Sequence, residues 1–102
     1  MSLDLAILTD EGAQGESVSL GTETHYALMQ IVSGTQCQLL PRMNDYYADA
    51  DFDSDDVPLL LKEVKLVQQL STDTRVASSL QSIEDLCLKA MGLGKGLAVI
   101  SD

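Results

Sequence analysis

The acidic segment formed by residues 44–56, with the sequence NDYYADADFDSDD, is the feature that most restricts how this chain can fold. Its six aspartates stand among aromatic and small residues, and ionised carboxylates are almost never buried without a charged partner. The segment therefore cannot belong to the core. It is a solvated loop that ends in a helix cap, a cation site, or an acidic face offered to a basic partner.

The length, composition and charge of the chain limit the possible classes of protein. With 102 residues and 45% hydrophobic residues, the sequence favours one ordered domain that covers residues 1–102. The formal charge of -10 repels phosphate backbones and anionic lipid headgroups over a Debye length of about 8 Å. We therefore expect neither nucleic acid nor a membrane surface as a partner.

The N-terminus and the cysteines indicate the compartment. No stretch approaches the roughly 20 apolar residues that span a bilayer, and Asp4 stands where a signal peptide carries Lys or Arg. These observations predict a cytoplasmic protein. Cys37 and Cys87 show no CxxC or Cys/His spacing, so we expect two reduced, mostly buried thiols rather than a disulfide or a zinc site.

Alternating apolar and polar residues predict a hairpin at the N-terminus. Leu3, Leu5 and Ile7 alternate with polar or small residues, and residues 17–20 alternate again. The turn-forming residues 9–15 between the two runs predict a long loop.

Apolar residues at helical spacing predict three helices. Thr22 or Thr24 is the expected cap of the first helix. Asp53 or Ser54 is the expected cap of the second, in which Pro58 occupies an early position. The apolar positions of the three helices are Tyr26, Leu28, Met29, Ile31 and Val32; Val57, Leu60, Leu61, Val64, Val67 and Leu70; and Leu80, Ile83, Leu86, Cys87, Ala90 and Met91.

The end of the chain predicts a strand inside a sheet. The third helix should end at Gly92 or Gly94, and the almost wholly apolar residues 96–100 then predict a strand covered on both faces. Residues 37–41 are ambiguous between a short strand and an extended crossing. The order of elements predicts an α+β fold, in which a small, mostly antiparallel sheet of about three strands carries about three helices on one face.

Alternate aspartates in the acidic segment are compatible with calcium, because carboxylate oxygens are the ligands that a hard cation needs. An EF-hand would have glycine where Ser54 stands and a bidentate glutamate where Leu60 stands, so the pattern fails that test. A small calcium-binding or enzymatic domain that uses these carboxylates stays open as the alternative. The candidate ligands are Asp49, Asp51, Asp53 and Asp55.

Other motifs carry little catalytic information. Residues 92–96 contain the glycines and lysine of a phosphate-binding loop, but the predicted helix precedes them and the strand follows, which is the reverse order. His25 is the only histidine, and nothing local activates it or Cys37 as a catalytic pair. We interpret His25 as an ordinary residue in the first turn of a helix. We therefore expect no catalytic residue, no cofactor and no enzymatic activity.

Tyr46, Tyr47 and Phe52 place three of the four aromatic residues of the chain inside the acidic segment. Aromatic side chains anchor protein interfaces, and the surrounding charges steer an oppositely charged partner. The other interpretation is that one or two of the three pack beneath the segment and tether it.

Four stretches of the chain carry a resemblance to a known family: residues 3–8, residues 21–26, the acidic turn 49–56 that leads into residues 57–61, and residues 90–100. Together they cover most of the chain. In these stretches it resembles a family of small, single-domain bacterial proteins of mostly uncharacterised function, some of which are assigned as immunity proteins of polymorphic-toxin systems. The family often has a polar Ser-Asp and Asp-Gly element in the acidic turn, where this chain has Ala50 and Phe52.

The resemblance implies an α+β fold and an inhibitor of a toxin. An immunity protein for a nuclease needs a rigid acidic surface that complements a basic cleft, and the charge of -10 suits that role. We therefore expect a non-enzymatic domain that binds a basic protein, such as a toxin, with carboxylates for attraction and aromatics as anchors. The expected contact residues are Asp45, Tyr46, Tyr47, Asp49, Asp51, Phe52, Asp53, Asp55 and Asp56.

Overall fold

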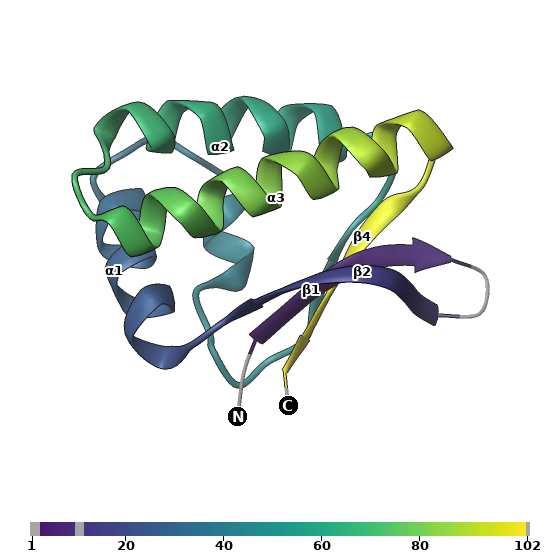
Figure 1. Ribbon diagram of the computed structural model, residues 1–102, viewed down its shortest axis with the longest axis horizontal. Coiled ribbons are helices and arrows are strands. Elements are labelled where there is room, and N and C mark those ends of the chain that lie inside the picture. Colours follow the sequence, from purple (N-terminus) through teal and green to yellow (C-terminus); the bar gives the residue numbers. More distant parts are fainter. Residues whose placement is uncertain (1–2, 10–11, 102) are drawn as a thin grey trace.

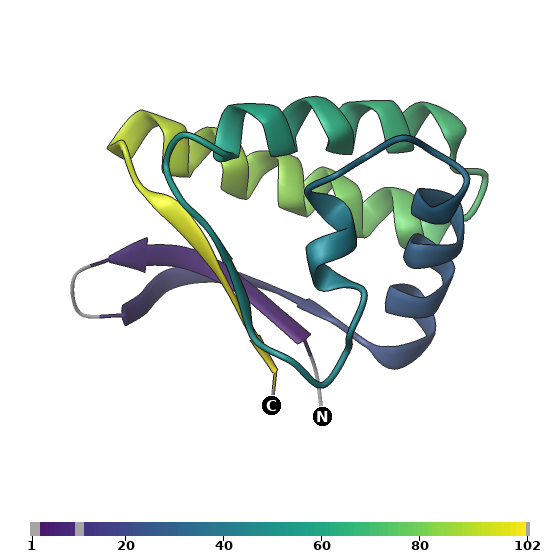
Figure 2. The same cartoon turned by 180° about the vertical axis from the view of Figure 1, so that it is seen from behind.

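The computed structural model describes residues 3–9 and 12–101, and within them it shows an α+β fold with four strands in one antiparallel sheet (Figures 1 and 2). The strand order is β2-β1-β4-β3, so the sheet has one strand more than predicted. Along the chain the elements are the strands β1 (Leu3–Thr9) and β2 (Gly12–Leu20), helix α1 (Thr22–Ser33), the short 3-10 helix η1 (Leu40–Met43), strand β3 (Ala50–Phe52), helices α2 (Val57–Leu70) and α3 (Thr74–Leu93), and strand β4 (Gly96–Ser101).

The N-terminal hairpin is confirmed, but its second strand begins earlier than predicted. A bulge shifts the register of β1 on β2 between Ala6 and Ile7. Within the bulged part of β2, Gly15 has a φ of 83°, which glycine adopts without strain. The bulge lets pairing continue through most of the loop predicted at residues 9–15, of which residues 10–11 lie outside the described part.

Strand β4 lies inside the sheet, between β1 and β3, as its apolar sequence predicted. Leu97 and Val99 are buried, and so is Ala98, whose side chain points to the opposite face. No helix packs on that face (Figure 1), so the prediction that β4 is covered on both faces is wrong, and Ile100 on that face is 36% exposed.

Strand β3, the one that the sequence did not predict, is formed by residues of the acidic segment. Phe52 is fully buried, whereas its neighbour Asp51 is exposed, which is the alternation of a strand with one face in the core. The aspartates on both sides conceal this short alternation in the sequence.

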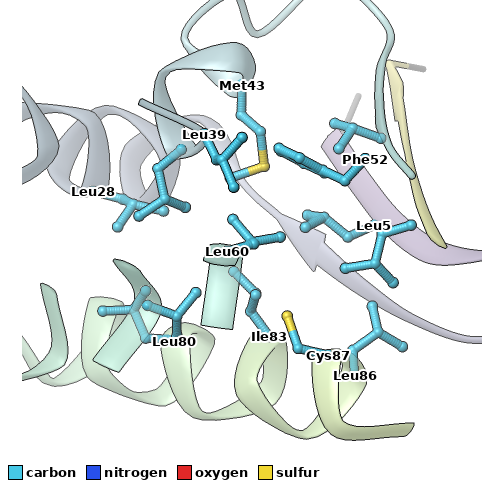
Figure 3. Packing of buried hydrophobic residues seen from close by; sticks show 14 of the residues in the cluster. Leu5, Leu28, Leu39, Met43, Phe52, Leu60, Leu80, Ile83, Leu86 and Cys87 are labelled. Atoms are coloured by element: carbon cyan, nitrogen blue, oxygen red, sulfur yellow. The ribbon is translucent and has the colours of Figure 1, made fainter. Parts of the chain in front are cut away.

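The helices lie on one face of the sheet, as predicted. Helices α2 and α3 run side by side, and α1 and η1 lie together near one end of that pair (Figures 1 and 2). The core fills the space between these layers, where Leu5 of β1, Phe52 of β3, Met43 of η1, Leu60 of α2 and Ile83 of α3 converge (Figure 3).

Helix α1 differs from its prediction in cap and in buried face. Gly21 is the N-cap and no side chain caps the helix, so the prediction of Thr22 or Thr24 is wrong; Thr22 is already helical. Tyr26 was expected on the apolar stripe but is 65% exposed, and its hydroxyl accepts a hydrogen bond from Gln30. The buried face consists of His25, Leu28, Met29 and Val32.

The ends of α3 follow local rules. Asp73 is the N-cap, and its carboxylate accepts hydrogen bonds from the backbone N–H groups of Arg75 and Val76 at 2.8 and 3.4 Å. These bonds, together with the guanidinium of Arg75, hold the pKa of Asp73 below its ordinary value. At the other end Gly94 adopts the left-handed conformation, with a φ of 65°, which confirms one of the two predicted ends.

The crossing at residues 37–41 is neither a strand nor an extended segment, because it leads directly into η1. Glu63 of α2 holds it in place. Its carboxylate accepts hydrogen bonds from the backbone N–H groups of Gln38, Leu39 and Leu40, the shortest of them 2.8 Å to Leu40. These charge-assisted bonds satisfy the unpaired donors at the start of η1.

Candidate functional site

Two of the three aromatic residues in the acidic segment lie in the core. Tyr46 is buried and its hydroxyl donates a hydrogen bond to the carbonyl oxygen of Leu20, 3.2 Å away. Phe52 is completely buried beneath β3. The interpretation that two aromatics tether the segment is therefore the one that the structure shows, and neither residue can contact a partner in this conformation.

Tyr47 is the aromatic residue of the segment that faces solvent. Its side chain is 69% exposed, and its ring lies edge-on to that of Tyr46 with 5.4 Å between the centroids. Its backbone N–H donates to the carboxylate of Asp45 at 2.9 Å, which fixes the turn that presents it. Tyr47 is thus held in place by its contact with buried Tyr46 and by the hydrogen bond to Asp45.

His25 links helix α1 to the acidic segment. A ring N–H at Nε2 donates to the carbonyl oxygen of Met43 over 2.6 Å, and the ring lies 5.0 Å from that of Tyr46. The side chain is buried. It therefore stabilises the junction between α1, η1 and the acidic segment, a larger structural role than the ordinary first-turn residue that we expected.

Four of the six aspartates have local structural roles. Asp49 accepts a hydrogen bond from the backbone N–H of Ser101 at 2.7 Å and so joins the segment to the end of β4. Asp53 accepts from the backbone N–H groups of Asp55 and Asp56, both at 3.0 Å, and so holds the turn that precedes α2. The N-cap of α2 is Asp56 and no side chain caps the helix, so the prediction of Asp53 or Ser54 as the cap is wrong. Asp45 holds the turn at Tyr47, as described above.

Asp56 pairs with Arg42, the basic residue nearest to the acidic segment in the sequence. Their side chains approach to 3.1 Å. The same guanidinium lies 5.5 Å from the centroid of the Phe52 ring and 3.4 Å from the backbone oxygen of Asp51. Arg42 therefore covers the free edge of β3, a role that the sequence did not reveal.

Asp51 and Asp55 are the carboxylates of the segment that remain open to solvent. Both are exposed, and neither side chain forms a hydrogen bond or ion pair with another residue of the described ranges. They are therefore free to interact with an external charge.

The described residues contain no group of three or more His, Cys, Asp or Glu side chains that could hold a metal ion. Of the four aspartates proposed as calcium ligands, Asp51 lies in β3, and Asp53 and Asp55 lie in the turn that follows it. Asp49 and Asp53 are also engaged by backbone N–H groups. The segment thus spreads its carboxylates along the surface instead of converging them on one point.

Shallow hollows lie on the described surface, and two of them adjoin the acidic segment, one at Asp56 and one at Asn44. The hollow at Asp56, of about 510 Å³, lies between residues 36–42 and α2, and it is lined by Arg42, Asp56, Leu59 and Lys62 among others. A second, of about 440 Å³, separates β2 from α3.

The hollow at Asn44, of about 210 Å³, holds both His25 and Ser33. Both groups bind backbone oxygens, because the Ser33 hydroxyl donates to Gln30 at 2.7 Å and the His25 ring donates to Met43. Neither is poised for catalysis in this arrangement.

Both cysteines are free thiols, Cys37 half-buried and Cys87 fully buried. Burial, with a smaller effect of the nearby Glu84 carboxylate, raises the pKa of the Cys87 thiol to about 12. None of the described helices is long and apolar enough to cross a bilayer.

No protein-family model, curated protein or solved structure matches this chain. The resemblance to immunity proteins therefore stays a prediction, and the functional argument must be made from the site itself.

Proposed function

We propose that this chain is a non-enzymatic binding domain that presents its acidic segment to a basic protein, in the manner of an immunity-type inhibitor of a basic toxin. The observation that carries the proposal is the 69% exposure of Tyr47 on a rigid turn among exposed carboxylates. A large aromatic side chain held in water is typical of an anchor that becomes buried on binding.

The segment is preorganised for such a role. Tyr46 and Phe52 fix it from below, while Asp49 and Asp53 fix it through backbone N–H groups. A partner would therefore bind a surface that is already ordered, and little conformational entropy would be lost. Tyr46 and Phe52 support the surface in this proposal and do not touch the partner.

Charge and contact would act at different stages of association. The carboxylates of Asp51 and Asp55 would attract a basic partner from a distance and speed association, because neither forms a hydrogen bond or ion pair with a described residue. Tyr47 would then fill a pocket or rest on an arginine of the partner and slow dissociation.

Affinity capture from the native host tests the proposal with three baits. The parent and a Tyr26→Ala variant should retain the same basic protein, and Tyr47→Ala should lose it. Tyr26 is the matched control because it is 65% exposed but lies on α1, outside the acidic segment. All three baits should melt at similar temperatures, because both tyrosines are on the surface.

Binding kinetics with the captured protein then separate the two effects. Tyr47→Ala should raise the dissociation rate at least tenfold, whereas Asp51→Asn with Asp55→Asn should lower the association rate and flatten its salt dependence. The proposal fails if Tyr26→Ala and Tyr47→Ala weaken binding equally, or if the captured protein is acidic and its binding does not respond to salt.

A further inference from the structure

Helix α2 has two apolar sides, and only one of them packs against the core of the protein. Val57, Leu60, Leu61, Val64 and Val67 form the buried side. Leu59, Leu66 and Leu70 are 52%, 45% and 53% exposed. At about 3.6 residues per turn, the spacing of these three leucines places them within about 40° of one another on the opposite side of the helix. We call Leu59, Leu66 and Leu70 the leucine stripe.

The spacing of the stripe fits a second helix. Positions 59, 63, 66 and 70 repeat every four and three residues, which is the pattern of side chains along the seam between two packed helices. Glu63 occupies the one polar position of this repeat. Its carboxylate already accepts hydrogen bonds from three backbone N–H groups of residues 38–40. The carboxylate therefore keeps these hydrogen bonds when a second helix displaces water from the stripe.

The charges beside the stripe distinguish this face from the rest of the protein. Helix α2 carries Lys62 and Lys65, and neither forms an ion pair with a described residue. Glu63 is its only acidic residue. In a chain with a formal charge of -10, two copies can therefore approach through α2 without bringing free carboxylates of this helix together.

We propose that the leucine stripe binds the same stripe of a second copy of this chain, with the two α2 helices antiparallel and Leu66 at the two-fold axis. In this arrangement Lys62 of each copy lies opposite Leu70 of the other, in the last turn of its α2. That turn contains no basic residue, and Asp73 follows it closely in the sequence. Each lysine thus meets the negative end of the partner helix, which is the charge complementarity that favours the antiparallel pair.

The dimer leaves the Tyr47 end of the proposed partner-binding surface free, whereas Asp55 and Asp56 lie beside the start of α2. The end of β4 at Ser101 holds residues 46 and 49 through hydrogen bonds. This end of β4 lies on the far side of the molecule from α2 (Figure 2). A dimer would therefore carry two acidic segments, and its formation does not depend on the proposed function.

The dimer should be weak and should strengthen with salt. Three leucines per copy are a small part of the roughly 800 Å² that each partner contributes to a stable interface, so the dimer should form only at high protein concentration. Salt screens the repulsion between two strongly acidic chains and thus favours the dimer. Binding of a basic protein to the acidic segment has the opposite salt dependence, so failure of one proposal can be told from failure of the other.

Sedimentation velocity measures the dimer fraction from about 10 µM to about 1 mM protein, in about 0.05 M and about 0.5 M NaCl. We expect the parent to dimerise, more strongly at the higher salt. Leu66→Glu should weaken association at least tenfold. Leu88→Glu is the matched control, since Leu88 is 49% exposed on a different helix, α3, and this variant should dimerise as the parent does.

Lys62→Ala and Lys65→Ala test the antiparallel orientation of the two α2 helices. They also test the dimer itself if Leu66→Glu fails to fold. Lys62 flanks the seam, about 40° from Leu66 around the helix, whereas Lys65 lies about 100° from Leu66, so only Lys62→Ala should weaken association, by several fold. A parent that stays monomeric at the highest concentration and salt overturns the proposal. Equal losses in Leu66→Glu and Leu88→Glu, or in Lys62→Ala and Lys65→Ala, also overturn it.

Discussion

The backbone of Phe52 lies so close to Gly96 that a β-carbon at position 96 would collide with the Phe52 carbonyl oxygen and press on the backbone of Asp53. The close approach joins β3 to β4 at the point where the acidic segment turns toward α2. A glycine is therefore required at position 96 by contact with a neighbouring strand and not by its own φ angle.

Gly96→Ala should lower the free energy of unfolding by about 2–4 kcal/mol, because β3 must move away and Phe52 must leave its packed position. Gly92→Ala is the control, since a β-carbon at position 92 meets nothing within 4 Å. Inside helix α3 that change should be neutral or stabilising by about 0.5–1 kcal/mol. Urea unfolding of the two variants measures the difference, and equal midpoints would show that β3 yields without cost.

Glu63→Gln should destabilise the protein by about 1–3 kcal/mol, because it replaces charge-assisted bonds to three backbone N–H groups by weaker neutral ones. Glu84→Gln serves as the control, because the Glu84 carboxylate has only a long 3.3 Å hydrogen bond from the Gln81 side chain. Thermal unfolding of both variants provides the comparison. A Glu63→Gln variant as stable as Glu84→Gln would mean that the crossing at residues 37–41 holds itself in place.

The raised pKa of Cys87 predicts how stability depends on pH in the alkaline range. The folded thiol has a pKa of about 12, whereas the unfolded thiol has an ordinary value near 9. Below about pH 9 both states are protonated, and the contribution is fully present. Between about pH 9 and pH 12 only the unfolded state loses the proton, so stability falls by at most about 1.4 kcal/mol per pH unit.

Urea unfolding across this pH range, in the parent and in Cys87→Ala, isolates the contribution of the thiol. The parent should lose stability more steeply than the variant. Alkylation of the native protein at neutral pH gives a second readout, in which half-buried Cys37 reacts first and Cys87 reacts only on unfolding. Identical pH slopes, or rapid labelling of Cys87 in the folded protein, would contradict the assignment.

The lowered pKa of Asp73 predicts a loss of stability in acid. A carboxylate with a depressed pKa stabilises the fold above its unfolded pKa, near 3.8, and this stabilisation is lost as the pH falls through the folded value. Asp73→Ala should reduce the melting temperature at neutral pH by a few degrees and remove this acid dependence. Asp73→Asn should keep the cap but not the dependence, and a thermal melt of each variant at neutral and acid pH distinguishes these outcomes.

Calcium should leave the melting temperature of the protein unchanged to within about 1 °C even at millimolar concentration. The reason is that the described residues contain no cluster of three or more side chains that could coordinate a metal ion. Magnesium at the same concentration controls for ionic strength. A calcium-specific rise that disappears in Asp51→Asn would restore a cation site in the acidic segment.

Local patterns predicted the parts of the fold in which neighbouring residues share one environment. The apolar spacing from Val57 to Val67 and the continuous apolar run around Leu97 were sufficient to predict α2 and an internal β4, because burial of either element follows from its own sequence. The short alternation at β3 was hidden, since strand and acidic loop occupy the same residues.

The candidate site was harder to predict because it depends on contacts between distant segments. Tyr46 and Tyr47 are adjacent and chemically identical, and only the position of Leu20 and His25 decides which of them is buried. The bonds from Glu63 to residues 38–40 likewise join parts of the chain that no local pattern connects.

The hydrogen bonds from Ser101 to Asp49 and to the backbone oxygen of Tyr46 make the end of β4 and the acidic segment one mechanical unit. The amide of Ser101 can exchange with solvent only when Asp49 releases it. A protein that binds the acidic segment would slow that release, so occupancy of the surface could be followed as slower deuterium uptake at the end of β4.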